Sequence, residues 1–320
     1  MRSNRTGRAT FFARAPSTEA MLTLEYLAEL FARRREAYDA EPAPVAIPGT
    51  DLVLGAGPAI MGVINLSPDS WYRESVCLSP KAAIRRGLVL QAQGADLIDI
   101  GAESTLANAA RADASLQESR LRPVVEELAD RGAVVSVETY LPQTARVALR
   151  AGARLINLTG IRHADAIFEA AAEADAALIL CYVEGPDVRA VGEFELGSDP
   201  VDRMLAYFEQ WIERARRRGL DRLLVDPGLG FYYPNLQDSA ARVSYQIRMF
   251  LETFRLRALG MPVCHALPHA FEYFGEEVRA AEAFFAVLAA LGKTDLFRTH
   301  EAAKARAVLE TLSAFSPSVS

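Results

Sequence analysis

The sequence predicts an α/β fold of the (β/α)8 TIM-barrel type, preceded by an N-terminal helical extension. From about residue 51 onward, short apolar runs alternate with longer amphipathic stretches, in eight successive pairs. The apolar runs are continuously hydrophobic, as expected of parallel strands that are covered on both faces. No GxGxxG sequence follows the first run, which argues against a doubly wound open sheet.

The residues before this pattern form two expected segments. Residues 1–20 are rich in arginine and contain no acid before Glu19, so we interpret them as a disordered terminus or a transit-like leader. Residues 21–50 are expected to form a helix, because apolar residues recur at helical spacing, and then a proline-rich linker. The barrel domain is expected over residues 51–320.

The expected barrel elements follow one another at regular intervals. The strands are predicted at 59–65, 95–101, 133–139, 153–160, 176–183, 222–228, 261–267 and 295–298. The helices are predicted near 80–93, 116–131, 142–151, 163–174, 199–218, 236–258, 276–291 and 301–314. Several predicted helices are followed by a glycine, which favours the positive φ that closes a helix.

Composition excludes several classes of partner. The net charge of −6 and a pI near 5.4 argue against nucleic acid or an anionic membrane as the main partner. No apolar run reaches the roughly 18 residues of a membrane-spanning helix. Three cysteines cannot all pair and show no metal-binding spacing, which indicates reduced thiols in a cytoplasmic setting.

Polar residues interrupt the apolar runs toward their carboxyl ends, where barrels of this type gather their functional groups. Asp99, Glu138, Asn157 and Asp226 are of this kind. A buried carboxylate is costly unless it is paired or hydrogen-bonded. The paired oxygens of a carboxylate accept two parallel N–H donors. These four side chains are therefore expected to bind a flat heterocycle with an amidine-like edge.

Each of these residues also has a purely structural interpretation. Asp226 can brace the DPGLGF turn, and Asn157 can be a satisfied core amide. Glu138 can form an ordinary salt bridge, and Asp99 can bond a strand to a loop. The function of these residues is therefore a hypothesis at this point.

A second group of residues indicates an anion site. Arg298 and His300 stand two residues apart on the last predicted strand and point to the same side. They suit a phosphate or diphosphate, and Asn65 suits a magnesium ion shared with that anion. His265 and His269 alone do not make a metal site.

Motifs at the predicted strand ends resemble those of the dihydropteroate synthase family of pterin-binding TIM barrels. IMGVINLSPDSW resembles the first-strand signature, GADLIDIGAEST the second and VSVETY the third. AGARLINLTG, DRLLVDPGLGF and DLFRTHEA follow in the family's order. The resemblance covers roughly residues 51–314 and identifies the chain as a divergent member of this family.

The resemblance implies roles for individual residues. Pterin binding is implied for Glu138, Asn157, Asp226 and His269. Diphosphate binding is implied for Asn65, Arg298 and His300, with Asn65 also contacting the Mg²⁺ ion. Loops near the second substrate are implied to contain Ser67, Asp69, Ser104 and Thr105.

The resemblance also implies a reaction of folate biosynthesis. A transferase of this family joins the methylene of a 7,8-dihydropterin, with diphosphate as leaving group, to an arylamine such as p-aminobenzoate. Such a reaction needs positioning and charge stabilisation rather than a strong protein nucleophile, in agreement with the lack of an activated Ser or Cys arrangement. Barrels of this family often pair, so a homodimer is one expectation.

The seventh strand departs from the family pattern. Where the family has Ser-Arg-Lys-Ser-Phe, this chain reads Leu267-Pro268-His269-Ala270-Phe271, which places His269 at the Lys position. The alternative hypothesis is therefore a pterin-binding homologue with a different nucleophile substrate, or with no catalytic activity, acting as a carrier, sensor or partner subunit. The retained Arg298 and His300 favour catalysis on a diphosphate.

Overall fold

The structure is a computed structural model that describes residues 21–70, 72, 75–104, 110–192, 199–229 and 238–315. The chain divides into two compact units, one ending at Asp39 and the other beginning at Ala40. Residues 40–50, which we expected in a linker, therefore belong to the larger unit. The expectation for residues 1–20 lies outside the described residues.

The smaller unit is helical. Helix α1 (Leu24–Arg33) begins after Thr23, whose hydroxyl accepts a hydrogen bond from the backbone N–H of Tyr26 at 3.2 Å. The backbone leaves the helical region at Arg34, with φ −124° and ψ 24°, and α2 (Arg35–Tyr38) follows. The single helix expected at the start of residues 21–50 is therefore two short helices.

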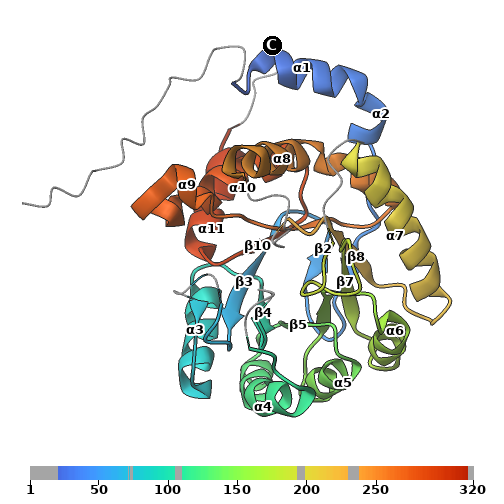
Figure 1. The fold of residues 1–320 in the computed structure, drawn as a ribbon, viewed down its shortest axis with the longest axis vertical. Coiled ribbons are helices and arrows are strands. Elements are labelled where there is room, and N and C mark those ends of the chain that lie inside the picture. The colour runs from blue at the N-terminus through green and yellow to red at the C-terminus, as the bar shows by residue number, and fades with distance from the viewer. Residues whose placement is uncertain are drawn as a thin grey trace, which may run out of the picture. The chain divides into compact units, whose positions relative to one another are not determined.

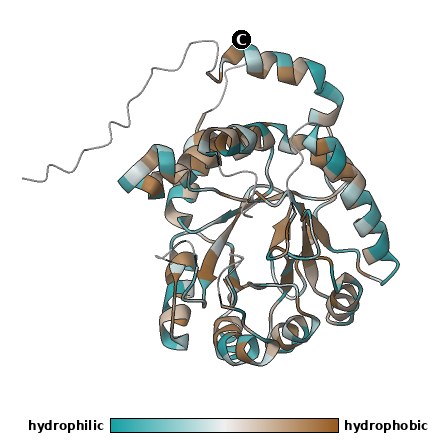
Figure 2. Cartoon of the chain, in the orientation of Figure 1, coloured by the Kyte–Doolittle hydropathy of each residue, from teal (hydrophilic) through white to brown (hydrophobic). Residues whose placement is uncertain are grey.

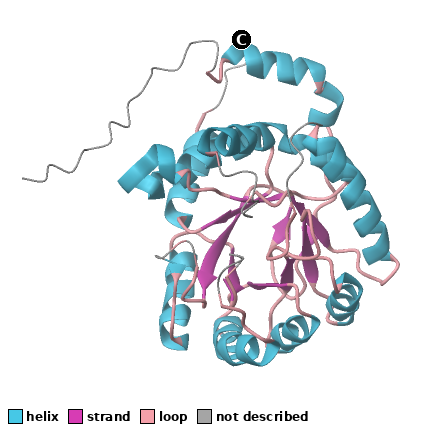
Figure 3. Ribbon diagram, viewed as in Figure 1, coloured by secondary structure: helices cyan, strands magenta, loops and turns pink. Residues whose placement is uncertain are grey.

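The larger unit contains the predicted barrel, and the fold prediction is confirmed (Figures 1 and 3). The eight parallel strands are β3 (Ala59–Asn65), β4 (Leu97–Gly101), β5 (Val135–Thr139), β6 (Leu155–Leu158), β7 (Ala177–Cys181), β8 (Leu223–Asp226), β9 (Cys264–Ala266) and β10 (Leu296–Thr299). They are ordered β8-β7-β6-β5-β4-β3-β10-β9. A parallel bridge between Val225 and Val263 joins the two end strands and brings the barrel close to closure.

Helices surround these strands (Figure 1). The main ones are α3 (Pro80–Ala92), α4 (Ala114–Asp130), α5 (Pro142–Arg150), α6 (Ala164–Glu173), α7 (Pro200–Arg216), α8 (Ser239–Glu252), α10 (Ala281–Leu291) and α11 (Ala302–Ser313). The strands are the most uniformly hydrophobic elements (Figure 2), as two-sided burial requires. Among the described residues, no helix is both long and apolar enough to cross a membrane.

Two predicted helices are shorter than expected. In the segment 236–258, α8 gives way to a 3-10 helix, η3 (Thr253–Leu259). The Thr253 hydroxyl donates to the carbonyl of Met249 at 2.9 Å, a side-chain bond that disturbs helices. In the segment 276–291, a short α9 (Phe271–Phe274) and a 3-10 helix, η4 (Gly275–Ala280), precede α10.

A small antiparallel hairpin packs at the amino end of the barrel. Its strands are β1 (Val45–Ala46) and β2 (Val53–Leu54). Buried side chains of this segment, including Ile47 and Leu54, join a core cluster with residues at the starts of barrel strands, such as Ala59 and Leu97. The amino end is thus filled by apolar side chains, and the polar residues lie toward the carboxyl end.

Candidate active site

A chain of polar contacts spans the barrel interior from β10 to β6. Arg298 donates from Nε to Asp99 Oδ2 at 2.8 Å and from Nη2 to Glu138 Oε2 at 2.6 Å. Asp99 has no exposed surface, and it also accepts from Ser136 Oγ at 2.7 Å and from Asn157 Nδ2 at 3.1 Å. One guanidinium therefore neutralises part of the charge of two buried carboxylates.

Asp226 lies on β8, two strands beyond β6, where this chain of contacts ends. Asn157 is linked to β7 because the Cys181 thiol donates to its Oδ1 at 3.3 Å, and Cys181 is paired in register with Asp226. Asp226 accepts the backbone N–H of Gly228 at 2.7 Å and a hydrogen bond from the Cys264 thiol. The structure thus brings together the three pterin-binding residues predicted on β5, β6 and β8.

Burial raises the pKa of two of these carboxyl groups. The pKa of Glu138 rises to about 7 because the side chain is desolvated, although Arg298 opposes the shift. The charges of Asp99, Asp226 and Glu103 add to this rise. The pKa of Asp226 rises to about 6, again through desolvation, against the hydrogen bond from the Gly228 N–H. Both groups therefore titrate near neutral pH.

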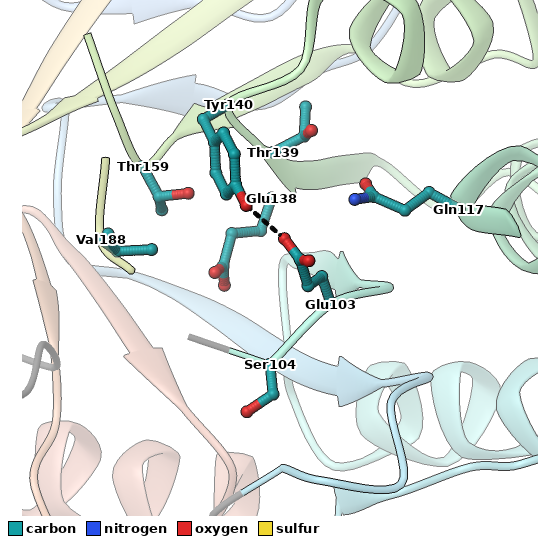
Figure 4. A pocket seen from close by; sticks show the side chains of 8 residues that line it. All are labelled: Glu103, Ser104, Gln117, Glu138, Thr139, Tyr140, Thr159 and Val188. Atoms are coloured by element: carbon teal, nitrogen blue, oxygen red, sulfur yellow. Dashed lines mark hydrogen bonds between the residues drawn. The ribbon is translucent and has the colours of Figure 1, made fainter. Parts of the chain in front are cut away.

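A polar hollow opens beside Glu138 (Figure 4). It is lined by Glu103, Ser104, Gln117, Glu138, Thr139, Tyr140, Thr159 and Val188. The Tyr140 hydroxyl donates to Glu103 Oε2 at 2.5 Å, and Arg189 Nη1 lies 3.2 Å from Glu103 Oε1. Glu103 is thus held between a phenol and a buried guanidinium, next to the carboxylate of Glu138.

The loops after β3 and β4, which contain the residues predicted near the second substrate, contact each other. The Ser104 hydroxyl donates to the carbonyl of Asp69 at 3.0 Å, and Ser67 Oγ accepts the N–H of Asp69 at 3.3 Å. Asp69 Oδ2 also accepts the N–H of Ala110 at 3.2 Å. Thr105, the fourth residue predicted there, lies outside the described residues.

Asn65, the residue predicted to contact a magnesium ion, has its side-chain amide held by a neighbouring serine. Its Nδ2 donates to Ser75 Oγ at 2.6 Å, which fixes the orientation of the amide. A Cβ added at Gly101 would lie 3.5 Å from Asn65 Oδ1 and 3.7 Å from Glu138 Oε2, so both oxygens face the space above Gly101. Mg²⁺ prefers such oxygen ligands and takes few of them from the protein, so Asn65 Oδ1 would suit the ion, whereas Glu138 Oε2 is already bonded to Arg298 Nη2 at 2.6 Å.

His300 and His269 form a separate cluster. Both imidazoles contact the same oxygen of Glu282, with His300 Nδ1 at 2.9 Å and His269 Nε2 at 3.3 Å from Oε1. The ring of Tyr72 stacks on His300 with centroids 4.4 Å apart. His300 and Arg298, predicted to share one anion, thus have different partners in this structure.

Several residues of the site were not predicted from the sequence. Glu282 carries a detectable signal, because it is an acid on the buried face of the otherwise apolar segment AEAFFAVLAAL. Tyr140 and Arg189 carry no such signal, since their importance depends on the contact with Glu103. The sequence alone does not reveal which side chains from distant segments contact each other, as Tyr140 and Arg189 contact Glu103.

Comparison with known proteins agrees with this geometry. The family described as "pterin binding enzyme" matches residues 61–300. Dihydropteroate synthase of Mycobacterium leprae is 35% identical over 175 residues, which span 54% of this chain and 62% of that enzyme. Dihydropteroate synthase type-2 of Escherichia coli is 30% identical over 264 residues, 80% of this chain and 95% of that enzyme.

A solved structure shows the same likeness over most of the chain. Xanthomonas albilineans dihydropteroate synthase with 4-aminobenzoic acid has a TM-score of 0.71 and 29% identity, and the match covers 85% of this chain and 98% of that chain. The region that matches the family, residues 61–300, includes β4, β5, β6, β8 and β10, the strands that position the polar cluster. This chain belongs to the pterin-binding enzyme family, among the dihydropteroate synthases.

Proposed function

We propose that this protein is a dihydropteroate synthase that joins the methylene of a 7,8-dihydropterin diphosphate to an arylamine such as p-aminobenzoate. The observation that carries the proposal is the grouping of Glu138, Asn157 and Asp226 in one buried region of the barrel. Their oxygens can accept the N–H donors along one edge of a pterin ring. The Xanthomonas albilineans relative with 4-aminobenzoic acid supports an arylamine as second substrate.

The charges of the site suit the expected bond changes. The bond between the methylene carbon and the diphosphate oxygen breaks, the arylamine nitrogen bonds to that carbon, and the nitrogen loses a proton. Asp99, Glu138 and Asp226 with Arg298 carry three negative charges and one positive charge when ionised, a net −2. This excess negative charge stabilises the cation that develops on the pterin as diphosphate leaves.

Asn65 and His300 are proposed to hold the leaving group. Asn65 Oδ1 would contact a magnesium ion, and that ion would supply positive charge to the departing diphosphate. The hollow beside Glu138 and Tyr140 is proposed to receive the arylamine. The reaction is proposed to take place in the cytoplasm, and a homodimer stays a prediction that sedimentation velocity can test.

The direct test is turnover of the full chain. Incubation with 7,8-dihydropterin diphosphate, Mg²⁺ and p-aminobenzoate is expected to yield 7,8-dihydropteroate and diphosphate in equal amounts, both measured by chromatography. Diphosphate release that does not depend on p-aminobenzoate would indicate a different nucleophile. Pterin binding without any release would indicate the non-catalytic alternative.

Pterin binding is expected to release protons at pH 6 and almost none at pH 8. Glu138, with a pKa of about 7, and Asp226, with a pKa of about 6, are partly protonated at pH 6 and must ionise to accept N–H donors. Calorimetry in buffers of different ionisation enthalpy counts the released protons. Glu138→Gln should reduce the number at pH 6, and an equal number at both pH values would contradict the assignment.

A further inference from the structure

The cluster formed by His269, Glu282 and His300 has the composition of a metal site. His269 follows β9, Glu282 lies in the first turn of α10 and His300 follows β10. One donor atom of each residue lies within 4.8 Å of the others. Two imidazole nitrogens and one carboxylate oxygen are ligands that zinc and similar transition metals favour, whereas magnesium prefers oxygen alone.

The carboxylate of Glu282 is held in a single orientation. Its Oε2 accepts the N–H of His300 at 3.0 Å, the N–H of Glu301 at 3.1 Å and the Thr299 hydroxyl. The other oxygen, Oε1, is the one that both imidazoles contact. Hydrogen bonds that orient a ligand in this way are a regular feature of metal sites.

The distances within the cluster suit a tetrahedral ion. Bonds of about 2.0–2.1 Å place two ligand atoms of a tetrahedral zinc ion about 3.3 Å apart. The separations from Glu282 Oε1 are 2.9 Å to His300 Nδ1 and 3.3 Å to His269 Nε2. An ion therefore needs only small side-chain movements to enter.

Tyr72 packs against the imidazole rings of both His269 and His300, and the two histidines stay partly open to solvent. The ring of Tyr72 lies 4.4 Å from that of His300 and 4.6 Å from that of His269, between centroids. The side chains of His300 and His269 keep 13% and 10% of their surface exposed, while Glu282 keeps 1%. Solvent thus reaches the imidazole side of the cluster, where a fourth ligand would bind.

We propose that His269, Glu282 and His300 bind one divalent transition-metal ion of the zinc type, with a fourth position open to water or to a substrate oxygen. The ion neutralises the buried Glu282 and leaves a net positive site beside the barrel mouth. The site uses none of Glu138, Asn157, Asp226 and Asn65, and it shares His300 with the proposed diphosphate site, so the open fourth position faces the same anion.

The test measures metal binding without substrate. Protein freed of metal by a chelator is titrated with Co²⁺, whose visible absorption is intense in tetrahedral sites, and then with Zn²⁺ as competitor. One Co²⁺ per chain is expected, displaced by Zn²⁺. His269→Ala and His300→Ala should each weaken binding by about 100-fold or more. His163→Ala is the matched control, because His163 is exposed at the start of α6, outside the cluster, and its loss should change nothing.

The outcomes separate this proposal from the proposed function. Absence of a saturable Co²⁺ spectrum, or equal binding by wild type, His269→Ala and His300→Ala, would overturn the metal site. Circular dichroism checks that each variant is folded, and Glu282→Gln provides a third variant that keeps the side-chain volume. Pterin binding, measured separately on metal-free protein, reports on the pterin site alone, so either proposal can fail without the other.

Discussion

Replacing Arg298 with alanine is expected to lower the free energy of unfolding by about 3–5 kcal/mol at pH 8. The change leaves Asp99 and Glu138 buried without the guanidinium that bonds both of them. Uncompensated buried charge costs far more than the pair itself contributes. Urea unfolding followed by circular dichroism measures the loss.

The difference in the free energy of unfolding between wild type and Arg298→Ala should become smaller as the pH falls. Arg298 favours the ionised form of Glu138, whose folded pKa of about 7 already exceeds that of an unfolded glutamate. Below that pKa the carboxyl accepts a proton and no longer needs the cation, so wild type and variant converge. Arg146→Ala is the control, because the Arg146–Glu173 pair is exposed and contributes less than about 1 kcal/mol. Equal losses for the two variants at pH 8 would contradict the central role of Arg298.

Replacing Asp226 with alanine is expected to weaken pterin binding by about 2–4 kcal/mol, or roughly 30- to 1,000-fold in Kd. The carboxylate is 4% exposed, so its loss leaves ring N–H donors desolvated and unpaired. Calorimetry with a pterin at pH 8, where the carboxylate is ionised, measures the effect.

Asp221→Ala is the matched control for this experiment. Asp221 precedes the same strand, β8, at its amino end and is exposed, whereas Asp226 ends that strand. Pterin affinity should therefore be unchanged in Asp221→Ala. Unchanged affinity in Asp226→Ala, with the variant folded, would remove Asp226 from the pterin site.

The barrel could be predicted because its physical signals are local. Apolar runs such as 59–65 and 176–183 need cover on both faces, and each becomes a parallel strand, β3 and β7. The break in the segment 236–258 could not be predicted in the same way. It coincides with the hydrogen bond that the Thr253 side chain makes to the helix backbone, which helical spacing does not encode.

The site could be predicted only in part. Parallel strands end at one face of the barrel, so residues at strand ends, such as Glu138 and Asn157, are neighbours by topology. Which partner each buried charge takes depends on side-chain direction across the barrel. For that reason the sequence did not indicate that Arg298 bonds to Asp99 and Glu138, and its role as an anion ligand stays a prediction.

The hairpin of β1 and β2 determines at which end of the barrel substrates enter and products leave. Ile47 and Leu54 fill the amino end of the barrel with apolar side chains. Both substrates and both products are therefore expected to enter and leave at the carboxyl end. Asp226 and Asn157 are almost fully buried, so a pterin ring bonded to them would lie further from solvent than an arylamine beside the partly exposed Tyr140. We therefore expect an ordered sequence in which the pterin arrives first and the arylamine second, which product-inhibition kinetics can reveal.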